Sequence, residues 1–197
     1  QAKYKLGTLL LSNNKNKEAI EQFLAIGDFQ NSKLLLLRCF FNLNMKQEFL
    51  NLLQEFINKN VVHPIIGSLV SRFNLKHQEN QKNLFCSKPL DFVSKTNLKT
   101  LCDFEEVFVK PSKHILSINK VPQKSYDLLT NGYQTEGNVF ELDSEPIKKI
   151  EKFIHEQIIK YQNNFGGSKE GLIQNCPDRY TLYGWLICMK SGGELRP

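Results

Sequence analysis

The chain has 197 residues, of which 41% are hydrophobic and 11% aromatic, so it can form a folded core and does not belong to the disordered class. Its length suits one large domain or two small ones. No run of about 18 apolar residues occurs, which excludes a predicted membrane-spanning helix.

The net charge of +6 suggests a nucleic-acid partner, but the residues that carry the charge argue against one. Lysine outnumbers arginine 22 to 4, whereas base readout and bidentate phosphate contacts favour arginine. The excess lies in residues 1–83, with 11 basic against 6 acidic side chains, while residues 84–197 carry 15 against 14. We therefore expect no nucleic-acid partner.

The cysteines and histidines are too widely spaced to predict a metal site. No Cys-x-x-Cys pair occurs, and an odd, scattered set of cysteines is typical of reduced thiols in a cytoplasmic protein. The histidines show no His-x-x-x-His or His-x-Asp/Glu spacing, so each is interpreted as a surface or capping residue. These residues are Cys39, Cys86, Cys102, Cys176, Cys188, His63, His77, His114 and His155.

Residues 1–83 are predicted to form helices joined by short polar turns, because their apolar residues recur at intervals of three and four. Asparagines and glycines separate these segments, and Pro64 suits the first turn of the last helix. The predicted helices cover about residues 2–12, 17–26, 32–43 and 46–58, followed by one that starts after Pro64.

The first two predicted helices resemble a tetratricopeptide repeat. Leu6-Gly7 is followed after twelve residues by Ala19 and after four more by Phe23, and this spacing recurs in such repeats. Small residues at Gly7 and Ala19 let two antiparallel helices approach closely, and Phe23 fills the next groove. About 30 residues on, the same spacing recurs without the small residues, at Leu37, Phe49 and Leu53. A generic stack of α-hairpins is the alternative.

An isolated helical solenoid usually needs at least three units. The sequence begins with Gln1 and not with Met, so we expect its amino terminus, with further helices, to be missing. No basic segment followed by an apolar one opens the sequence, so no signal peptide is predicted. Together with the cysteine pattern, this favours a cytoplasmic location.

From residue 84 the helical spacing of apolar residues is no longer regular, because prolines interrupt it. Residues 89–93 are expected to start a short helix, and residues 114–118 alternate weakly and predict a strand. Asn131-Gly132 is typical of a turn. Residues 137–140 are expected to be a strand or extended chain.

Residues 144–165 are predicted to form the clearest helix of the chain. Ser144 or Asp143 can cap it, and Pro146 suits its first turn. Gly166-Gly167 ends it. One apolar stripe runs along this helix, formed by Ile147, Ile150, Ile154, Ile158, Tyr161 and Phe165.

The last part of the sequence is predicted to contain a strand and a turn. Residues 180–189 are apolar or aromatic on both alternating faces, which predicts a strand that is buried on both sides. Residues 191–193, Ser-Gly-Gly, are expected to form a turn.

Three segments together resemble the opening of a 2-oxoglutarate- and iron(II)-dependent oxygenase domain: residues 132–140, the helix over 144–165, and residues 184–197 from Gly-Trp to the Gly-Gly turn. Members of that group often carry tetratricopeptide repeats upstream. The resemblance implies an α+β protein, with a helical repeat in residues 1–83 and the incomplete start of a double-stranded β-helix, a jelly-roll-like fold, in residues 84–197.

The resemblance also implies where iron would bind. In such domains a His-x-Asp or His-x-His pair directly follows the Gly-Gly turn, and here that position falls beyond Pro197. The third ligand and the basic residue that holds 2-oxoglutarate come later still. No catalytic or metal residue is therefore assigned, and no cofactor-binding residue is known. Iron(II), 2-oxoglutarate and hydroxylation-type chemistry are implied for the full-length parent, and this chain alone is expected to be inactive.

Three residues could line the sheet near the pocket of such a domain: Gln134, Trp185 and Met189. The alternative interpretation places Trp185 and Met189 in an ordinary core and gives Gln134 a turn contact.

A protein-protein interaction scaffold without enzymatic activity remains the alternative function. The helical repeat would then present a groove to a peptide or protein partner, and residues 84–197 would form a structural cap. The sequence after Pro197 distinguishes the two hypotheses, because only the oxygenase requires a His-x-Asp/His pair there. Neither hypothesis identifies a substrate.

Overall fold

A computed structural model describes residues 1–117, 123–124 and 129–196. The chain divides into two compact units. Unit 1 comprises Gln1–Val93 with Gly166–Cys176, and unit 2 comprises Ser94–Phe165 with Pro177–Pro197. The architecture is α-rich with one small sheet, which confirms the α+β class. Among the helices described, none combines the length and apolar character needed to cross a bilayer.

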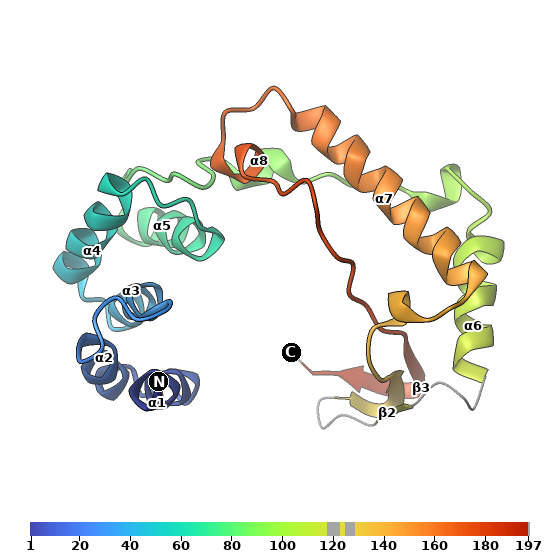
Figure 1. Cartoon of the computed structure of the whole chain (residues 1–197), viewed down its shortest axis with the longest axis horizontal. Coiled ribbons are helices and arrows are strands. Elements are labelled where there is room, and N and C mark those ends of the chain that lie inside the picture. The colour runs from blue at the N-terminus through green and yellow to red at the C-terminus, as the bar shows by residue number, and fades with distance from the viewer. Residues whose placement is uncertain (118–122, 125–128, 197) are drawn as a thin grey trace. The chain divides into compact units, whose positions relative to one another are not determined.

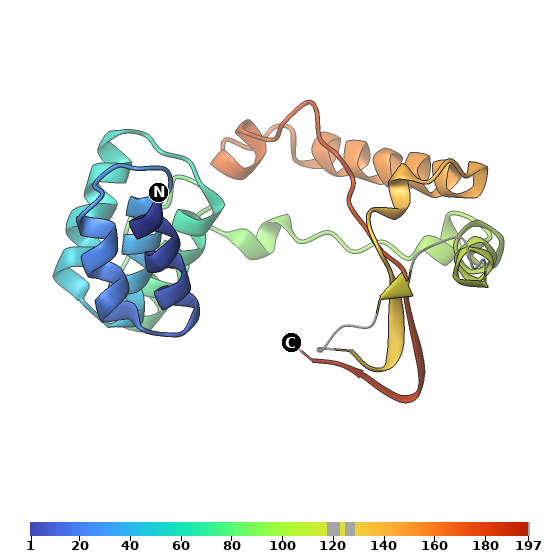
Figure 2. The same ribbon diagram turned by 60° about the horizontal axis from the view of Figure 1, so that its bottom comes forward.

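Five helices form the first part of unit 1, and their bounds confirm the sequence prediction to within two residues. Each of the first three contacts the next, and α3 also contacts α1 and α5. Phe49 of α4 stacks on Phe73 of α5, so the helices lie side by side (Figures 1 and 2). The core between them contains the fully buried Phe23, Phe49 and Phe73. The helices are α1 (Ala2–Ser12), α2 (Asn16–Leu24), α3 (Ser32–Asn42), α4 (Lys46–Asn58) and α5 (Pro64–His77).

The turn between α1 and α2 recurs between α3 and α4. Each turn places an asparagine, Asn14 or Asn44, in the left-handed region with a φ of 58°, a conformation that asparagine adopts more readily than most residues. In both turns the backbone N–H of the following residue donates to a carbonyl in the last turn of the preceding helix, at 2.9 Å. After α4, Asn60 has a φ of 51° in a similar position. The connections therefore share one backbone geometry.

A segment from the second stretch of unit 1 closes the stack beyond α5. The helical turn α8 (Gly171–Gln174) lies against residues 84–86, and the Leu172 N–H donates to the Phe85 carbonyl at 2.7 Å. The Glu170 carboxylate accepts hydrogen bonds from the backbone N–H, at 2.9 Å, and the hydroxyl of Ser87. Two parts of the chain that are far apart in sequence therefore complete unit 1.

Unit 2 is built around α7 (Glu145–Phe165), which confirms the predicted helix over 144–165. Its buried Ile147 and Ile150 pack with Ile115 of α6 (Lys110–Ser117). Partly buried side chains surround this core: Val107, Phe108, Phe140, Leu142, Ile154 and Leu186. The π-helical η3 (Glu105–Val109) and the 3₁₀ turns η2 (Leu98–Thr100) and η4 (Val139–Glu141) belong to the same unit.

A three-stranded antiparallel sheet completes unit 2, in the order β1 (Gln123–Lys124), β2 (Leu129–Thr135), β3 (Ile187–Leu195). Strands β2 and β3 pair Gln134 with Ile187, and the register shifts between Thr130 and Gly132. At this shift one residue of β2, Asn131, faces four residues of β3, 190–193, and such an irregularity bends and twists the pair locally.

Three predictions between residues 84 and 143 need correction, and one is confirmed. Residues 114–117 belong to α6 and are not a strand, because Ile115 packs on α7; Ile118 lies outside the described residues. Asn131-Gly132 lies inside β2 and does not form a turn, since Gly132 pairs with Met189 of β3. Residues 139–141 form the 3₁₀ turn η4, which Asn138 caps. The short helix expected after residue 89 is η1 (Pro89–Phe92).

Two further predictions fail in the last part of the chain. Residues 180–186 are extended but unassigned to a strand, and only one of their faces is covered: Tyr183 is 66% exposed and Trp185 48%. The strand predicted over 180–189 is therefore right only for residues 187–189, which lie in β3, and the predicted burial on both sides was wrong. Residues 191–193 lie inside β3, where Gly192 has a φ of 73°, so they form an irregularity of the strand and not a turn.

Candidate functional site

The segments that resemble an oxygenase meet at a junction formed by Thr135 and Asn138. The Thr135 N–H donates to the Leu186 carbonyl, and the Leu186 N–H donates to Thr135 Oγ1, both at 3.0 Å. Asn138 Oδ1 accepts from the Gly184 N–H at 3.0 Å, and its Nδ2 donates to the Leu182 carbonyl at 2.9 Å. Thr135 is 1% exposed and Asn138 7%, so these bonds are shielded from water.

Gly184 is required at this junction because of its distance to Phe140. A Cβ on Gly184 would lie 2.9 Å from Cε2 of that ring. The close approach lets the Val139 N–H donate to the Gly184 carbonyl at 2.9 Å. The glycine before Trp185 thus has a packing role that its sequence context alone does not reveal.

The three predicted pocket residues lie in and before the sheet. Gln134 is in β2 opposite Ile187, so it makes no turn contact. Met189 lies opposite Gly132 and is 51% exposed. Trp185 packs edge-on against Tyr183, with ring centroids 5.9 Å apart. Their exposure means that Trp185 and Met189 are not ordinary core residues.

The four histidines lie in four different surroundings. His63 Nδ1 accepts a hydrogen bond from the Ile65 N–H and caps α5. The His77 ring packs on Phe73 with centroids 4.4 Å apart and the rings tilted by 43°. His114 is exposed in the last turn of α6. His155 Nδ1 lies 2.8 Å from the Tyr180 hydroxyl. Within the described part of the chain, no three His, Cys, Asp or Glu side chains could hold a metal ion, so these residues do not fit an iron(II) site.

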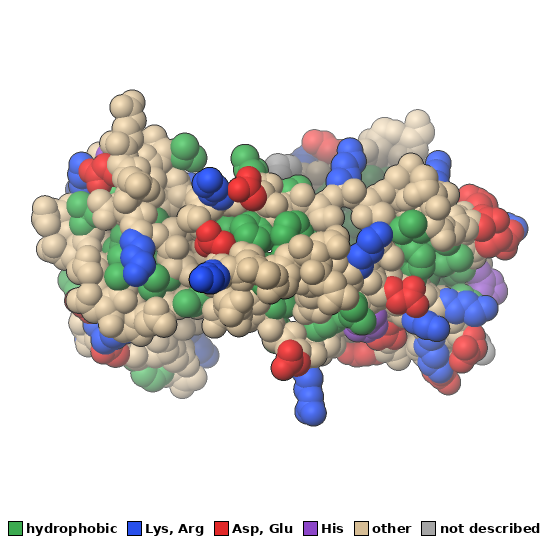
Figure 3. Space-filling view, turned by 90° about the horizontal axis from the view of Figure 1, so that it is seen from above, with side chains coloured by type: hydrophobic (Ala, Val, Ile, Leu, Met, Phe, Trp, Pro, Cys, Tyr) green, Lys and Arg blue, Asp and Glu red, His purple; other side chains and the backbone are tan. Residues whose placement is uncertain are grey.

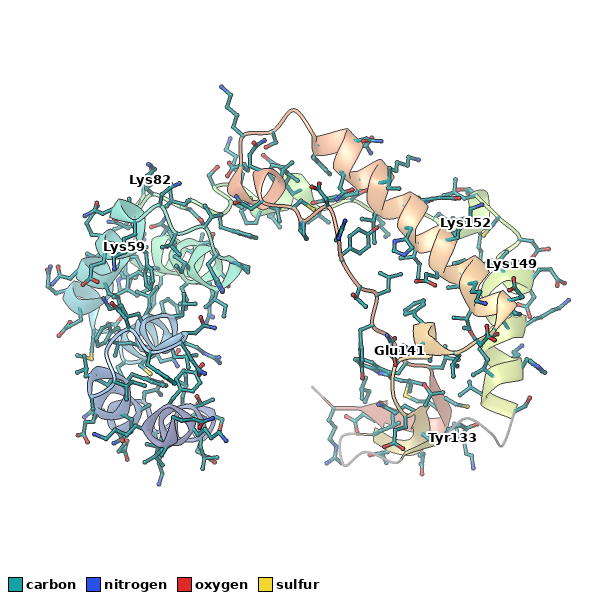
Figure 4. All side chains as sticks on the ribbon, in the orientation of Figure 1. Lys59, Lys82, Tyr133, Glu141, Lys149 and Lys152 are labelled. Atoms are coloured by element: carbon teal, nitrogen blue, oxygen red, sulfur yellow. The ribbon has the colours of Figure 1, made fainter. Side chains whose placement is uncertain are left out.

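The cysteines are all thiols, as the sequence predicted. Burial raises the pKa of Cys39 to about 11 and also raises that of Cys86, so both thiols are poor nucleophiles at neutral pH. Tyr133, labelled in Figure 4, pairs with Cys188 of β3 in the sheet register. The hydrogen bond between these two side chains raises the pKa of Tyr133.

A cluster of cations and one aromatic ring lies on α3 and α5. The Arg72 guanidinium carbon is 4.7 Å from the centre of the Phe41 ring, and Lys76 Nζ is 5.6 Å from it. Arg38 precedes Phe41 by one helical turn and therefore lies on the same face of α3. Among the described residues, none of these three cations has an acidic partner. We call Arg38, Phe41, Arg72 and Lys76 the Phe41 patch.

Sequence reasoning missed the Phe41 patch because Arg38 and Phe41 precede Arg72 and Lys76 by 31–38 positions, with no periodic pattern that links them. The two pairs come together only when α3 packs on α5. One signal was available: two of the four arginines of the chain lie in helices α3 and α5. The patch differs from the face of the molecule drawn in Figure 3, where charges of both signs occur and lie among one another.

Comparison of the chain with family models, curated proteins and solved structures finds no match. The function therefore has to be inferred from the residues and their arrangement.

Proposed function

We propose that residues 84–197 form the first part of a 2-oxoglutarate- and iron(II)-dependent oxygenase domain, and that the helices before them dock a peptide or protein partner. The junction at Thr135 and Asn138 carries this proposal. The Gln-Thr segment and the Gly-Trp segment are about 50 residues apart in sequence, yet they are hydrogen-bonded neighbours, as they would be if both served one sheet.

The proposed fold of this domain is a double-stranded β-helix. Such a fold consists of two antiparallel sheets, and β2 with β3 would belong to one of them. Strand β3 is an edge strand in the described sheet order, so its second edge can pair with another strand. The alternating exposure of residues 180–186 also supports this proposal, because one face packs on unit 2 and the other remains open.

The iron site of the proposed enzyme would lie outside the residues described. The four histidines offer no ligand set, so the ligands and the group that holds 2-oxoglutarate are assigned to the full-length parent. Iron(II) would supply the oxygen chemistry of a hydroxylation there. This chain would contribute the sheet that supports the site, held in place by Thr135 and Asn138.

The helices α1 to α5 are proposed to be tetratricopeptide-like repeats. The equal turns at Asn14 and Asn44 support a period of about 30 residues, within the range known for helical repeats. The close packing of Phe23 on Gly7 and the full burial of Ala19 support the first unit. Stacked helices of this kind present extended surfaces to partners.

The oxygenase proposal can be tested with the full-length protein that contains this chain. Without oxygen, that protein should bind 2-oxoglutarate in an iron(II)-dependent manner in calorimetry, whereas residues 1–197 should not. With oxygen, it should release succinate. If the full-length protein binds no 2-oxoglutarate with iron(II) present, the oxygenase proposal is wrong.

The scaffold function is the second candidate, and the Phe41 patch favours it. Arginine held over an aromatic ring keeps its N–H edges available for carboxylates, so the patch suits an acidic partner. A labelled polyglutamate peptide should bind the chain and should lose affinity in the Arg38→Glu/Arg72→Glu variant. The matched control, Lys17→Glu, changes an exposed lysine of α2 and should bind as the wild type does. Equal binding by both variants would contradict a role for the patch.

A further inference from the structure

A second surface of unit 1 forms a groove along the end of α5. It has a volume of about 830 Å³ and is lined by Ser71, Asn74 and Leu75 of α5 and by residues 79–83 and 87–91. We call residues 79–91 the strap and this cavity the strap groove. The volume falls within the range of about 300–1,000 Å³ that is usual for ligand sites.

Hydrogen bonds to α5 hold the strap in place. Asn74 Oδ1 accepts from the Gln81 N–H at 2.8 Å, and Asn74 Nδ2 donates to the Gln81 carbonyl at 3.0 Å. Glu79 accepts a hydrogen bond from Gln81 Nε2 at 2.7 Å and forms an ion pair with Lys46. The wall of the groove is therefore ordered before any partner binds, which reduces the entropy that binding would cost.

The backbone of the strap has unused hydrogen-bonding groups beside Gln81. Asn80 and Lys82 are exposed and lie in a segment that is neither helix nor turn. Among the described residues, none pairs with the backbone N–H or carbonyl of either. In extended chain, adjacent residues direct their backbone N–H and carbonyl groups to opposite sides, so residues 80 and 82 direct theirs away from the side used by residue 81. Because Asn74 occupies one side at Gln81, the groups of Asn80 and Lys82 are available on the other.

The rim of the groove is both aliphatic and basic. Leu75 and Leu90, which both border the groove, are each 83% exposed. Two leucines at one cavity therefore leave their apolar surface in water, which is typical of an interaction site. Lys82 and Lys88 have no acidic partner among the described residues. Of the two acids on the rim, Glu79 is already neutralised by Lys46, which leaves Asp91 against two lysines.

We propose that the strap groove binds an extended peptide segment that carries aliphatic side chains and carboxylates. The unpaired backbone groups of Asn80 and Lys82 would pair with the peptide backbone, as when a strand adds to a sheet edge. Leu75 and Leu90 would contact its aliphatic side chains. Lys82 and Lys88 would pair with its carboxylates, which determines the sign of charge that the groove accepts.

This inference goes beyond the proposed function, because it uses neither the Phe41 patch nor the junction at Thr135 and Asn138. It adds a binding surface at the closed end of the helical stack. The test must therefore separate the strap groove from the Phe41 patch, which also carries positive charge.

The test measures fluorescence anisotropy of a labelled peptide of alternating Asp and Leu with residues 1–197. We expect saturable binding that weakens about tenfold in the Lys82→Glu/Lys88→Glu variant. Leu75→Asn/Leu90→Asn should weaken it without a change of charge. The control, Lys59→Glu, alters an exposed lysine at the end of α4 and should leave binding unchanged (Figure 4). Circular dichroism confirms that each variant is folded.

Two further peptides test whether binding depends on the charge of the peptide and on its backbone hydrogen bonds, and the variants test which surface it occupies. A peptide of alternating Lys and Leu should bind at least about tenfold more weakly than the Asp peptide. Replacing its central residues by proline removes backbone N–H groups and should also reduce binding. The proposal is overturned if the acidic and basic peptides bind equally or not at all. It is also overturned if only the Arg38→Glu/Arg72→Glu variant loses binding, because the peptide would then occupy the Phe41 patch.

Discussion

The ring of Phe23 occupies the space that a side chain at position 7 would need. A Cβ on Gly7 would lie 2.7 Å from Cε1 of Phe23, closer than such atoms approach in folded proteins. Phe23 is 1% exposed and packed within the core, so its ring has little room to move. Glycine at position 7 therefore determines how closely α1 and α2 pack.

Gly7→Ala should destabilise the helical stack by about 1–3 kcal/mol through overpacking, despite the higher helix propensity of alanine. Thermal unfolding followed by circular dichroism measures the effect. Gly167→Ala is the matched control, since nothing lies within 4 Å of a Cβ there. Equal melting temperatures for the two variants would contradict the assigned contact.

Asn138→Ala should destabilise unit 2 by about 2 kcal/mol, because it leaves the Gly184 N–H and the Leu182 carbonyl without their partner. The chain has one tryptophan, Trp185, and it directly follows the segment that Asn138 holds. Urea unfolding followed by its fluorescence is therefore the appropriate measurement.

Asn163→Ala provides the control for Asn138, since it replaces an exposed asparagine of α7. Its free energy of unfolding should stay within about 0.5 kcal/mol of the wild type. A similar effect of both substitutions would show that the hydrogen bonds of Asn138 contribute little.

Cys39 should make the stability of the chain fall in alkaline solution. Burial raises the pKa of this thiol in the folded chain to about 11, against an ordinary value of 9.0. Above pH 9.0 the unfolded chain loses this proton first, so the contribution is complete below that pH and is lost as the pH rises through about 11. Two units of pKa correspond to about 2–3 kcal/mol.

The measurement compares the unfolding free energies of the wild type and Cys39→Ala across this pH range. Other groups that titrate there affect both proteins, so their difference isolates Cys39. We expect that difference to decrease from pH 9.0 toward pH 11. A difference that is constant with pH would disprove the assigned burial of the thiol.

Residues 1–197 should bind iron(II) only weakly, because His63 caps a helix, His77 packs on an aromatic ring, His155 bonds a tyrosine and His114 lies exposed on α6. Anaerobic titration of iron(II) into this chain and into the full-length protein tests the expectation. Tight, stoichiometric binding by residues 1–197 alone would reassign some of His63, His77, His114 and His155 as ligands. Single substitutions of the four by alanine would then identify them.

The helices of unit 1 could be predicted from the sequence because each depends on a local pattern. Apolar residues at intervals of three and four mark their buried faces, and Asn14 and Asn44 mark their ends. The same holds for α7, whose stripe of isoleucines packs against α6. The closing contact of Leu172 with Phe85 was beyond such reasoning, since it joins distant parts of the chain.

The strands and the candidate sites could not be predicted in detail because they depend on non-local pairing. Ile115 and Leu116 are compatible with a helix or a strand, and only the contact of Ile115 with α7 decides between them. Asn131-Gly132 is typical of a turn, yet the pairing of Gly132 with Met189 of β3 places it inside a strand. The Phe41 patch likewise needs the packing of two helices that the sequence leaves unplaced.

The closure of unit 1 by Glu170 and Leu172 has a consequence for synthesis on the ribosome. Ser87 and Glu170 are separated by 83 positions, so α1 to α5 are complete long before their closing segment exists. At about 5–20 residues per second, the delay is about 4–17 s. During that interval Leu84 and Phe85 lack their contacts with α8. The nascent chain would then be open to chaperones at this end, and a ribosome pause near residue 176 would prolong that state.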